Sequence, residues 1–472
     1  MTAAWLVIDS ALPGHARPPK RAIDVVTNAS APVVRRLTPD ELVTYLTARL
    51  RIMIRNGASA DAADLVTKRF TAAIGDAAAE ATADGLAAGH AVIAEVFSFN
   101  GHLAEAATAI RAAVDYAERD EYKFCAIGLR AMIEALNGEF VATRRSLEEA
   151  AALDAGKGWS RDYWPVIFAC SQLGGGDSPD DALESYAARL DDWHDSTVLE
   201  RILSRLMSAS MNMKKGDHRA ALAEAQLVAR SVETQPCPPL FAGKAISLEA
   251  GSLIMLGEVG PAIKLLNEHE SLPNHAICLE LFLAGIHLLM GEPRKALAAT
   301  EKCVRDVPNH SLRTFPSVLL RRAVAHEQLG HEARADANFS RASHMASEIG
   351  GVRPAMGLPL DILGRLLHRL VENEPEFGKK ILARIPLDGE YPDAPQLDFE
   401  PVHLSERELV LAKWLITDLT LAAIAAELHV SLNTVKTQTR SIYRKLEVTC
   451  REEAVHKLEA TGVLNLPEAA RD

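Results

Sequence analysis

A turn-like glycine between two helical patterns of apolar residues recurs through most of the chain. The glycines are Gly101, Gly138, Gly175, Gly216, Gly257, Gly291 and Gly330, spaced 34 to 41 residues apart. Apolar residues precede each glycine at helical spacing, as at Ile246, Ala250, Leu253 and Leu256. Small residues follow it, as in "RAALAEA", and small side chains let two helices approach closely. Each unit therefore predicts a pair of antiparallel helices joined at the glycine.

This repeat resembles the tetratricopeptide repeat, whose second helix begins after a glycine and carries alanine where the helices cross. The resemblance covers residues 37–384 and implies an α-solenoid with a concave groove. Such a groove typically takes a peptide, a protein or a small-molecule effector, although a plain α-solenoid spacer fits the same pattern. No segment alternates convincingly in the manner of a strand, so we expect an all-α fold.

Residues 385–403 break the helical pattern with four prolines and no lysine or arginine. Because proline removes an amide donor and fixes φ, no helix is expected there. We interpret this stretch as an acidic linker. Residues 1–36 are expected to be an irregular segment, and 467–472 a short tail.

Helix signals return after the linker in a compact series, at residues 404–466. Ser405, Thr420, Ser431 and Thr449 each precede an apolar pattern and are suited to cap the start of a helix. The second and third predicted helices are separated by only "HVS". Four short helices with this spacing predict a helix-turn-helix domain, in which the second helix of the pair lies in the DNA major groove.

The predicted third helix of this domain, within residues 431–448, has two distinct faces. Val435, Thr439, Ile442 and Leu446 form an apolar stripe. The opposite face carries Asn433, Lys436, Thr437, Arg440 and Arg444. Lysine and arginine can meet phosphates or guanine edges, and asparagine and threonine supply short hydrogen bonds or a methyl contact.

The motifs "LSERE", "IAAELHVSLNTVKT", "IYRKL" and "REEAV" occur here in order, and over this length the sequence resembles the LuxR-type (GerE-type) DNA-binding domain. The resemblance implies a bacterial regulator with a four-helix domain, whose third helix reads the major groove and whose fourth helix often forms a dimer contact. By position, it implies base contacts from Lys436, Thr437 and Arg440, and phosphate contacts from Ser431, Thr434, Arg444 and Lys445.

The sequence departs from the family pattern at four positions. Asp418 and Glu447 stand where glycine is usual, and Gln438 and Thr439 replace a histidine and an aliphatic residue. We expect Glu447 to loosen its turn or to place an acid near DNA, and Thr439 to weaken the core slightly. None of the four removes a cation.

The charge of the whole chain limits where nucleic acid can bind. The 472 residues carry a net charge of −12, which argues against coating by nucleic acid over the whole surface but leaves room for one basic face. Residues 404–464 hold eight basic and eight acidic residues. A neutral domain of this kind is expected to need dimerisation for firm binding.

No constellation in the sequence predicts an enzyme, a cofactor or a metal. The six cysteines form no CxxC pair, and no phosphate-binding loop occurs. "HEQLGH" places His326 and His331 five residues apart, on different faces of a continuous helix, so we interpret it as a repeat turn rather than a zinc motif.

The sequence therefore favours a cytoplasmic transcription regulator that binds double-stranded DNA as a homodimer, with RNA polymerase as a further candidate partner and no membrane contact. Residues 37–384 would act as a sensor or protein-interaction module. The alternative is an interaction scaffold in which the helix-turn-helix serves for docking or dimerisation.

Overall fold

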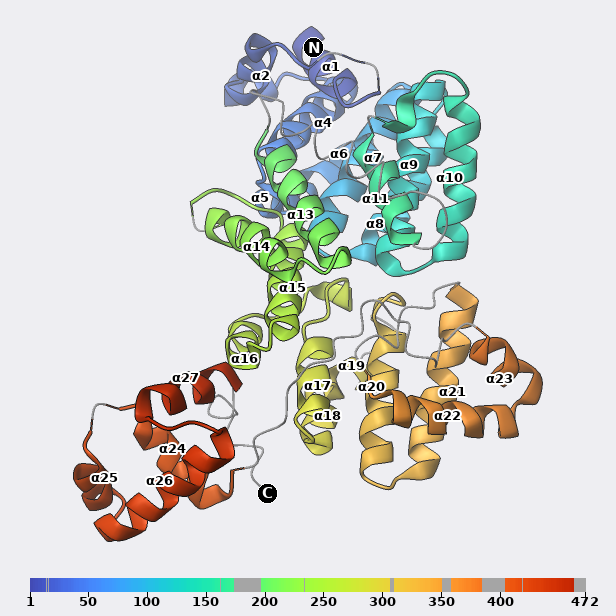
Figure 1. Ribbon diagram of the computed structural model, residues 1–472. Helices are drawn as coiled ribbons and strands as arrows, with labels where there is room; N and C mark the ends of the chain where they lie inside the picture. The colour runs from blue at the N-terminus through green and yellow to red at the C-terminus, as the bar shows by residue number, and fades with distance from the viewer. Residues whose placement is uncertain are drawn as a thin grey trace.

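The computed structural model consists of helices and the loops between them (Figure 1). It describes residues 1–13, 15, 17–161, 163–173, 197–232, 234–305, 310–349, 358–383, 404–417 and 419–461. No strand occurs in these ranges, which confirms the prediction of an all-α fold. None of the described helices is both long and apolar enough to span a membrane.

The helices fall into three runs along the chain. The first comprises α1 (Thr2–Asp9), α2 (Lys20–Thr27), α3 (Ala31–Val34), α4 (Pro39–Arg55), α5 (Ser59–Leu65), α6 (Thr71–Ala77), α7 (Ala83–Phe99), α8 (Leu103–Tyr116), α9 (Asp120–Asn137), α10 (Phe140–Asp154) and α11 (Trp164–Leu173). The second comprises α13 (Val198–Lys214), α14 (His218–Val232), α15 (Pro239–Met255), α16 (Val259–Asn267), α17 (Glu280–Leu289), α18 (Pro293–Ala299), α19 (Glu301–Arg305), α20 (Phe315–Gln328), α21 (Glu332–Ile349), α22 (Leu360–Asn373) and α23 (Pro375–Leu382). The third comprises α24 (Glu406–Leu415), α25 (Leu421–Glu427), α26 (Leu432–Leu446) and α27 (Arg451–Thr461).

The predicted glycines lie in turns between paired helices. Six of them have a positive φ, between 69° and 88°, and Gly175 lies outside the described residues. At Gly138 the left-handed turn lets the amide of Glu139 donate to Glu134 O at 2.8 Å, which ends α9 and starts α10. The hairpins α7–α8, α9–α10, α13–α14, α15–α16, α17–α18 and α20–α21 all form in this way.

Small residues after the glycine are buried between helices, as the sequence pattern predicted. Ala221 and Ala225 of α14 are fully buried where this helix packs against α13 and α15. Ala296 and Ala335 occupy the same kind of position in α18 and α21. The absence of bulky side chains there lets neighbouring helices pack closely.

The N-terminal segment differs from its prediction. Residues 1–36 were expected to be irregular, but they contain α1, α2 and α3. Val7 and Ile8 are buried where α1 packs against α4. A single amphipathic helix of this length has too few residues for its periodicity to stand out in the sequence.

The two large hydrophobic cores in the described part of the helical array meet at α17. Ile286 of α17 belongs to the core that extends from the N-terminus, and Ala284 and Leu288 belong to the core shared with α18, α20, α21 and α22. Figure 1 shows α17 and α18 beside α20, with which both are in contact. The loop before α17 therefore lies at the junction of the two cores.

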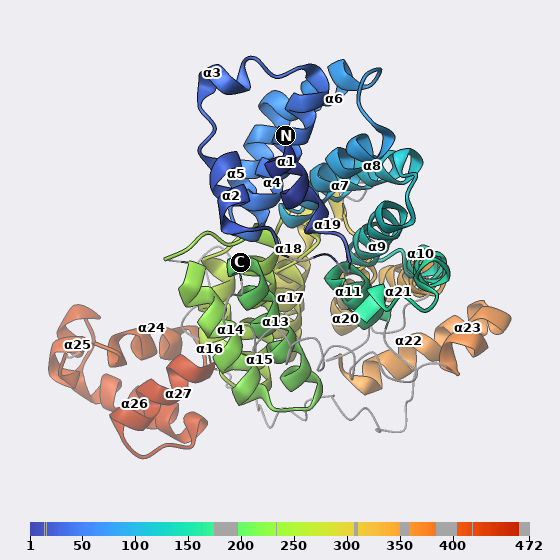
Figure 2. The same ribbon diagram turned by 90° about the horizontal axis from the view of Figure 1, so that it is seen from above.

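The last four helices form a unit with a core of its own. In both views α27 lies beside α16 of the array, and the two helices are in contact (Figures 1 and 2). Leu404 and Leu409 also pack against the array core. The predicted linker 385–403, the tail 467–472 and Asp418 lie outside the described residues.

Candidate nucleic-acid interface

Helices α25 and α26 form the predicted helix-turn-helix. Thr420 caps α25 by accepting the Ala423 amide at 3.2 Å, and Ser431 caps α26 by accepting the Thr434 amide at 3.1 Å. Between them, His429 has a φ of 54°, and the Val430 amide donates to Ala425 O at 3.0 Å. This tight connection fixes the direction in which α26 leaves the turn.

The apolar stripe of α26 is buried as the periodicity predicted. Val435, Ile442 and Leu446 are each 0% exposed. They pack with Leu415 and Ile424 in the core of the four-helix unit, and Leu428 is partly buried against it. This packing orients the opposite face of the helix toward solvent.

The outer face of α26 is exposed and rich in hydrogen-bond donors. It presents Asn433, Lys436, Thr437, Arg440 and Arg444, all of which are exposed. Lys436, Arg440 and Arg444 follow one another at intervals of four residues, so their side chains project from neighbouring turns. Ser431 and Thr434 are exposed at the N-terminal end of the helix, and the Thr437 hydroxyl donates to Asn433 O at 2.9 Å.

Lys445 differs from the other predicted contacts. Its Nζ lies 2.6 Å from Oε2 of Glu408 on α24, and its side chain is 35% exposed. At about 100° per residue it lies roughly 100° around the helix from Arg444, on the flank that faces α24. The structure therefore gives Lys445 a packing role that the sequence did not predict.

Glu408 joins the first helix of the unit to the third. Its carboxylate accepts hydrogen bonds from the Ser405 amide at 2.7 Å, from the Ser441 hydroxyl at 2.8 Å and from Lys445. Burial alone would raise the pKa of Glu408, but these donors outweigh burial and lower it to about 2. The capping box that Ser405 and Glu408 form at the start of α24 is thus part of a larger network.

Arg451, in the "REEAV" motif, donates hydrogen bonds to backbone carbonyls at and just after the C-terminal end of α24. Its guanidinium donates to Leu415 O at 2.9 Å, to Leu419 O at 2.7 Å and to Thr417 O. Carbonyls at the C-terminal end of a helix have no partner within the helix, so Arg451 satisfies groups that would otherwise remain unpaired. The sequence contained the motif but gave no sign of which atoms Arg451 contacts.

Two of the four departures from the family pattern have visible consequences. Glu447 ends α26 in the left-handed conformation, with a φ of 54°. Thr439 is 5% exposed, and its hydroxyl has no hydrogen-bond partner among the described residues. The threonine therefore buries a polar atom in the core of the unit, which agrees with the expectation that it weakens packing.

The "HEQLGH" motif forms a repeat turn, as predicted, but its histidines are closer than expected. α20 ends at Gln328 and Gly330 has a φ of 72°, so the chain turns back before His331. The Nδ1 atoms of His326 and His331 lie 3.4 Å apart as a result. In the described part of the chain, no third potential metal ligand joins this pair.

The comparison with known proteins bears on the region that contains this interface. Residues 402–458 match the GerE family, described as bacterial regulatory proteins of the luxR family. The match spans α24, α25, α26 and most of α27. A search of curated proteins found none that matches the chain. The match supports a LuxR-type helix-turn-helix domain at residues 402–458, and such a domain suggests a DNA-binding transcription regulator.

Proposed function

We propose that the chain is a transcription regulator that inserts α26 into the major groove of double-stranded DNA. The observation that carries this proposal is the exposed row formed by Lys436, Arg440 and Arg444 on the second helix of the helix-turn-helix. The buried stripe on the other side of α26 makes this row the outermost surface of the helix. Cations on an outward recognition helix are what groove binding requires.

The residues of this face have different proposed roles. Lys436, Thr437 and Arg440 read base edges, with Asn433 beside them, because they lie along the middle of the exposed face. Ser431, Thr434 and Arg444 contact phosphates near the two ends of α26. Lys445 acts mainly by holding α26 on α24 through Glu408.

Residues 37–384 are proposed to form a tetratricopeptide-like module that senses a partner. The repeated helical hairpins with left-handed glycines support this assignment. A pocket of about 180 Å³ lies between α21 and α22, lined in part by Asp336, Phe339, Leu370 and Glu374. Pockets for small ligands commonly measure about 300–1,000 Å³, so this pocket is small for such a ligand.

We further propose that the protein binds DNA as a homodimer. The equal numbers of basic and acidic residues in 404–464 give a single domain little net attraction for phosphate. The LuxR resemblance implies a dimer contact through α27, and α27 packs against α16 in the single chain. A partner that changes the conformation of the array near α16 would therefore alter the availability of α27 for the dimer contact. RNA polymerase is a further candidate partner of the DNA-bound form.

An interaction scaffold is the competing function. In that case the helix-turn-helix would serve only for docking or dimerisation, and the exposed cations of α26 would be an ordinary solvated surface. The two functions differ in whether the intact protein binds DNA at all.

A mobility-shift titration against genomic fragments selected by the purified protein distinguishes a transcription regulator from an interaction scaffold. A dimer brings about six cations, three from each α26, into the phosphate field of the groove, and each displaces counterions whether it meets a base edge or a phosphate. Log K should therefore fall with log salt with a slope of about −5. The affinity should then drop about 10³-fold between 50 and 200 mM salt. Failure of the intact protein to bind any fragment at low salt would favour the scaffold.

A further inference from the structure

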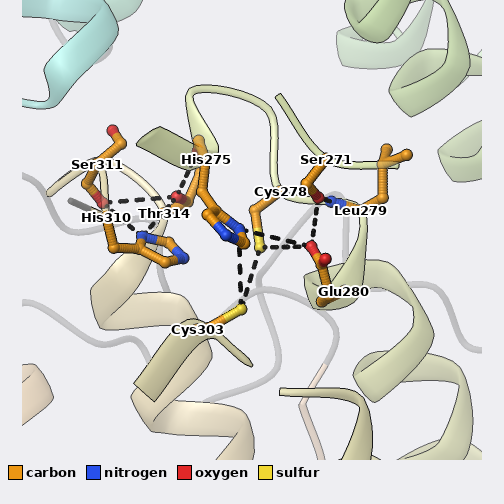
Figure 3. Close-up of polar contacts among 9 residues, drawn as sticks. All are labelled: Ser271, His275, Cys278, Leu279, Glu280, Cys303, His310, Ser311 and Thr314. Carbon is orange, nitrogen blue, oxygen red and sulfur yellow. Dashed lines mark hydrogen bonds and ion pairs between the residues drawn. The ribbon is translucent and has the colours of Figure 1, made fainter. Parts of the chain in front are cut away.

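Four metal-ligating side chains meet at the junction of the two array cores (Figure 3). They belong to His275, Cys278, Cys303 and His310, and one ligand atom from each lies within 4.8 Å of all the others. Three of the four residues are buried, and His275 is partly buried. No other residues in the described ranges bring three such ligands together.

The ligands come from three separate parts of the chain. His275 and Cys278 lie in the loop before α17, Cys303 lies on α19, and His310 precedes α20. The spacing is His-x2-Cys followed by Cys-x6-His, without a CxxC pair. The sequence therefore predicted no metal, because the site exists only when α19 and the segment before α20 pack against the loop.

Two of the distances between ligand atoms are close to those of a tetrahedral zinc centre. Cys278 Sγ lies 3.8 Å from Cys303 Sγ, and Cys303 Sγ lies 3.9 Å from His275 Nδ1. With Zn–S bonds of about 2.3 Å and Zn–N bonds of about 2.0–2.1 Å, tetrahedral geometry separates two sulfurs by about 3.8 Å and a sulfur from a nitrogen by about 3.6 Å. The remaining pairs of ligand atoms lie within 4.8 Å of each other, so an ion would draw these side chains together by up to about 1.5 Å.

His310 supplies independent evidence that the cluster takes a ligand. This residue is 5% exposed, and its Nε2 has no hydrogen-bond partner among the described residues. Its Nδ1 lies 3.1 Å from Ser311 O. A carbonyl can only accept, so this contact assigns the proton to Nδ1 and leaves Nε2 with its lone pair. In Figure 3, Nε2 is the ring nitrogen on the side toward His275 and Cys303.

The surrounding polar groups hold the ligands in place. Glu280 Oε2 lies 3.5 Å from both His275 Nδ1 and Cys278 Sγ, and it also accepts a hydrogen bond from Ser271. Thr314 donates to His275 O at 3.1 Å. Thr314 thus fixes the backbone that carries His275, whereas Glu280 borders the same Nδ1 and Sγ atoms that would bind the ion and would become an acceptor beside it.

The backbone of the loop is strained where it delivers the first ligand. Asn274 and His275 have φ values of 56° and 48°, in the left-handed region that residues with a Cβ adopt at a cost. The Ser311 amide donates to Asn274 O at 2.7 Å, and the Ser311 hydroxyl donates to Leu136 O at 3.2 Å. The site thus lies where the α16–α17 loop, the start of α20 and the end of α9 meet.

We propose that His275, Cys278, Cys303 and His310 bind one zinc ion, which joins the two halves of the helical array. Two thiolates and two imidazoles are the ligand set of many closed structural zinc sites. Binding replaces the thiol protons of Cys278 and Cys303, which are released to solvent. The ion leaves no open coordination position, so its role is structural, and it is independent of whether α26 binds DNA.

Metal analysis of the purified chain, prepared with a reductant and without chelators, tests the proposal. Wild-type protein should contain about one zinc ion per chain. The double variant Cys278→Ser plus Cys303→Ser should lose it, whereas the matched control Cys170→Ser plus Cys237→Ser should retain it. Zinc retained by the first variant would place the ion elsewhere, for instance at His326 and His331, and would overturn the assignment.

A second measurement does not depend on whether the variants fold. Metal-free wild-type protein titrated with Co²⁺ should develop the visible absorption bands of tetrahedral cobalt and the near-ultraviolet bands of thiolate ligands, saturating at about one equivalent. Added Zn²⁺ should remove these bands. Absence of the bands, or mass spectrometry showing Cys278 and Cys303 joined in a disulfide in freshly prepared protein, would overturn the proposal.

Discussion

Glu447 adopts an unfavourable backbone conformation at the end of the proposed recognition helix, α26. Its φ of 54° and ψ of 43° lie in the left-handed region, which glycine adopts without penalty and other L-residues adopt at a cost of about 1–2 kcal/mol. Replacing Glu447 with glycine should therefore raise the unfolding free energy of the four-helix unit by about 1 kcal/mol. Denaturant unfolding followed through this unit would measure the change.

A matched control for this variant is Glu427→Gly, since Glu427 is also exposed and is the last residue of α25. Glycine in a helical conformation should destabilise by up to about 1 kcal/mol. If both substitutions destabilised the unit to the same extent, the left-handed strain at Glu447 would not exist.

Thr439 places an unpaired hydroxyl in the core of the same unit. Valine has nearly the same shape without the polar atom, so Thr439→Val should stabilise the unit by about 1 kcal/mol. The exposed Thr437, whose hydroxyl already donates to Asn433 O, provides the control, and Thr437→Val should change stability little. Thermal unfolding of the two variants and wild type would measure these changes in stability. An unfolding midpoint lower than that of wild type for Thr439→Val would contradict the buried, unpaired position of the hydroxyl.

The contact between α24 and α26 depends on one buried carboxylate. Glu408 has a folded-state pKa of about 2, below its ordinary value, so its contribution to stability is present at neutral pH. That contribution should be lost as the pH falls from about 4.5 to about 2, because protonation then favours the unfolded state. Glu408→Gln should destabilise the unit at pH 7 by about 2 kcal/mol, with a smaller difference at acidic pH.

Unfolding free energies of wild type and Glu408→Gln between pH 7 and pH 3 would check this dependence. The exposed Glu427 of the neighbouring helix gives the control substitution Glu427→Gln. A difference between wild type and Glu408→Gln that stayed constant over the whole range would rule out the carboxylate as the titrating group.

Periodic features of the helices could be predicted from the sequence. The glycine turns were predicted because a left-handed residue and a change of helical face both leave marks in the order of residues. The two faces of α26 were predicted for the same reason. The short helix α1 was missed, since its burial against α4 comes from packing and not from a long repeating pattern.

Contacts between segments distant in the sequence could not be predicted. Lys445 was expected at a phosphate, but the side chain that it meets, Glu408, lies on another helix. Arg451 reaches carbonyls of the α24 end, which only folding brings near it. The cluster of His275 and Cys303 also has no signature spacing, because its ligands come from separate helices and loops.

The arrangement of the whole chain separates an acidic array from a small cationic face. The net charge of −12 is spread over the molecule, and Lys436, Arg440 and Arg444 lie together on exposed α26. Like charge between the array and phosphate discourages unspecific contact, so we expect DNA to bind at α26. The contact between α27 and α16 places the proposed sensor directly against the proposed DNA-binding domain.

The central claim is that DNA binding depends on the outer face of α26, and the double variant Lys436→Ala plus Arg440→Ala tests it. Its control, Arg407→Ala plus Lys413→Ala, removes the same charge from exposed positions of α24. Mobility-shift titrations over a range of salt concentrations should show the first variant binding selected DNA about 100-fold more weakly, with a shallower salt dependence, and the control within about threefold of wild type. Equal affinities for wild type and the α26 variant would contradict the account.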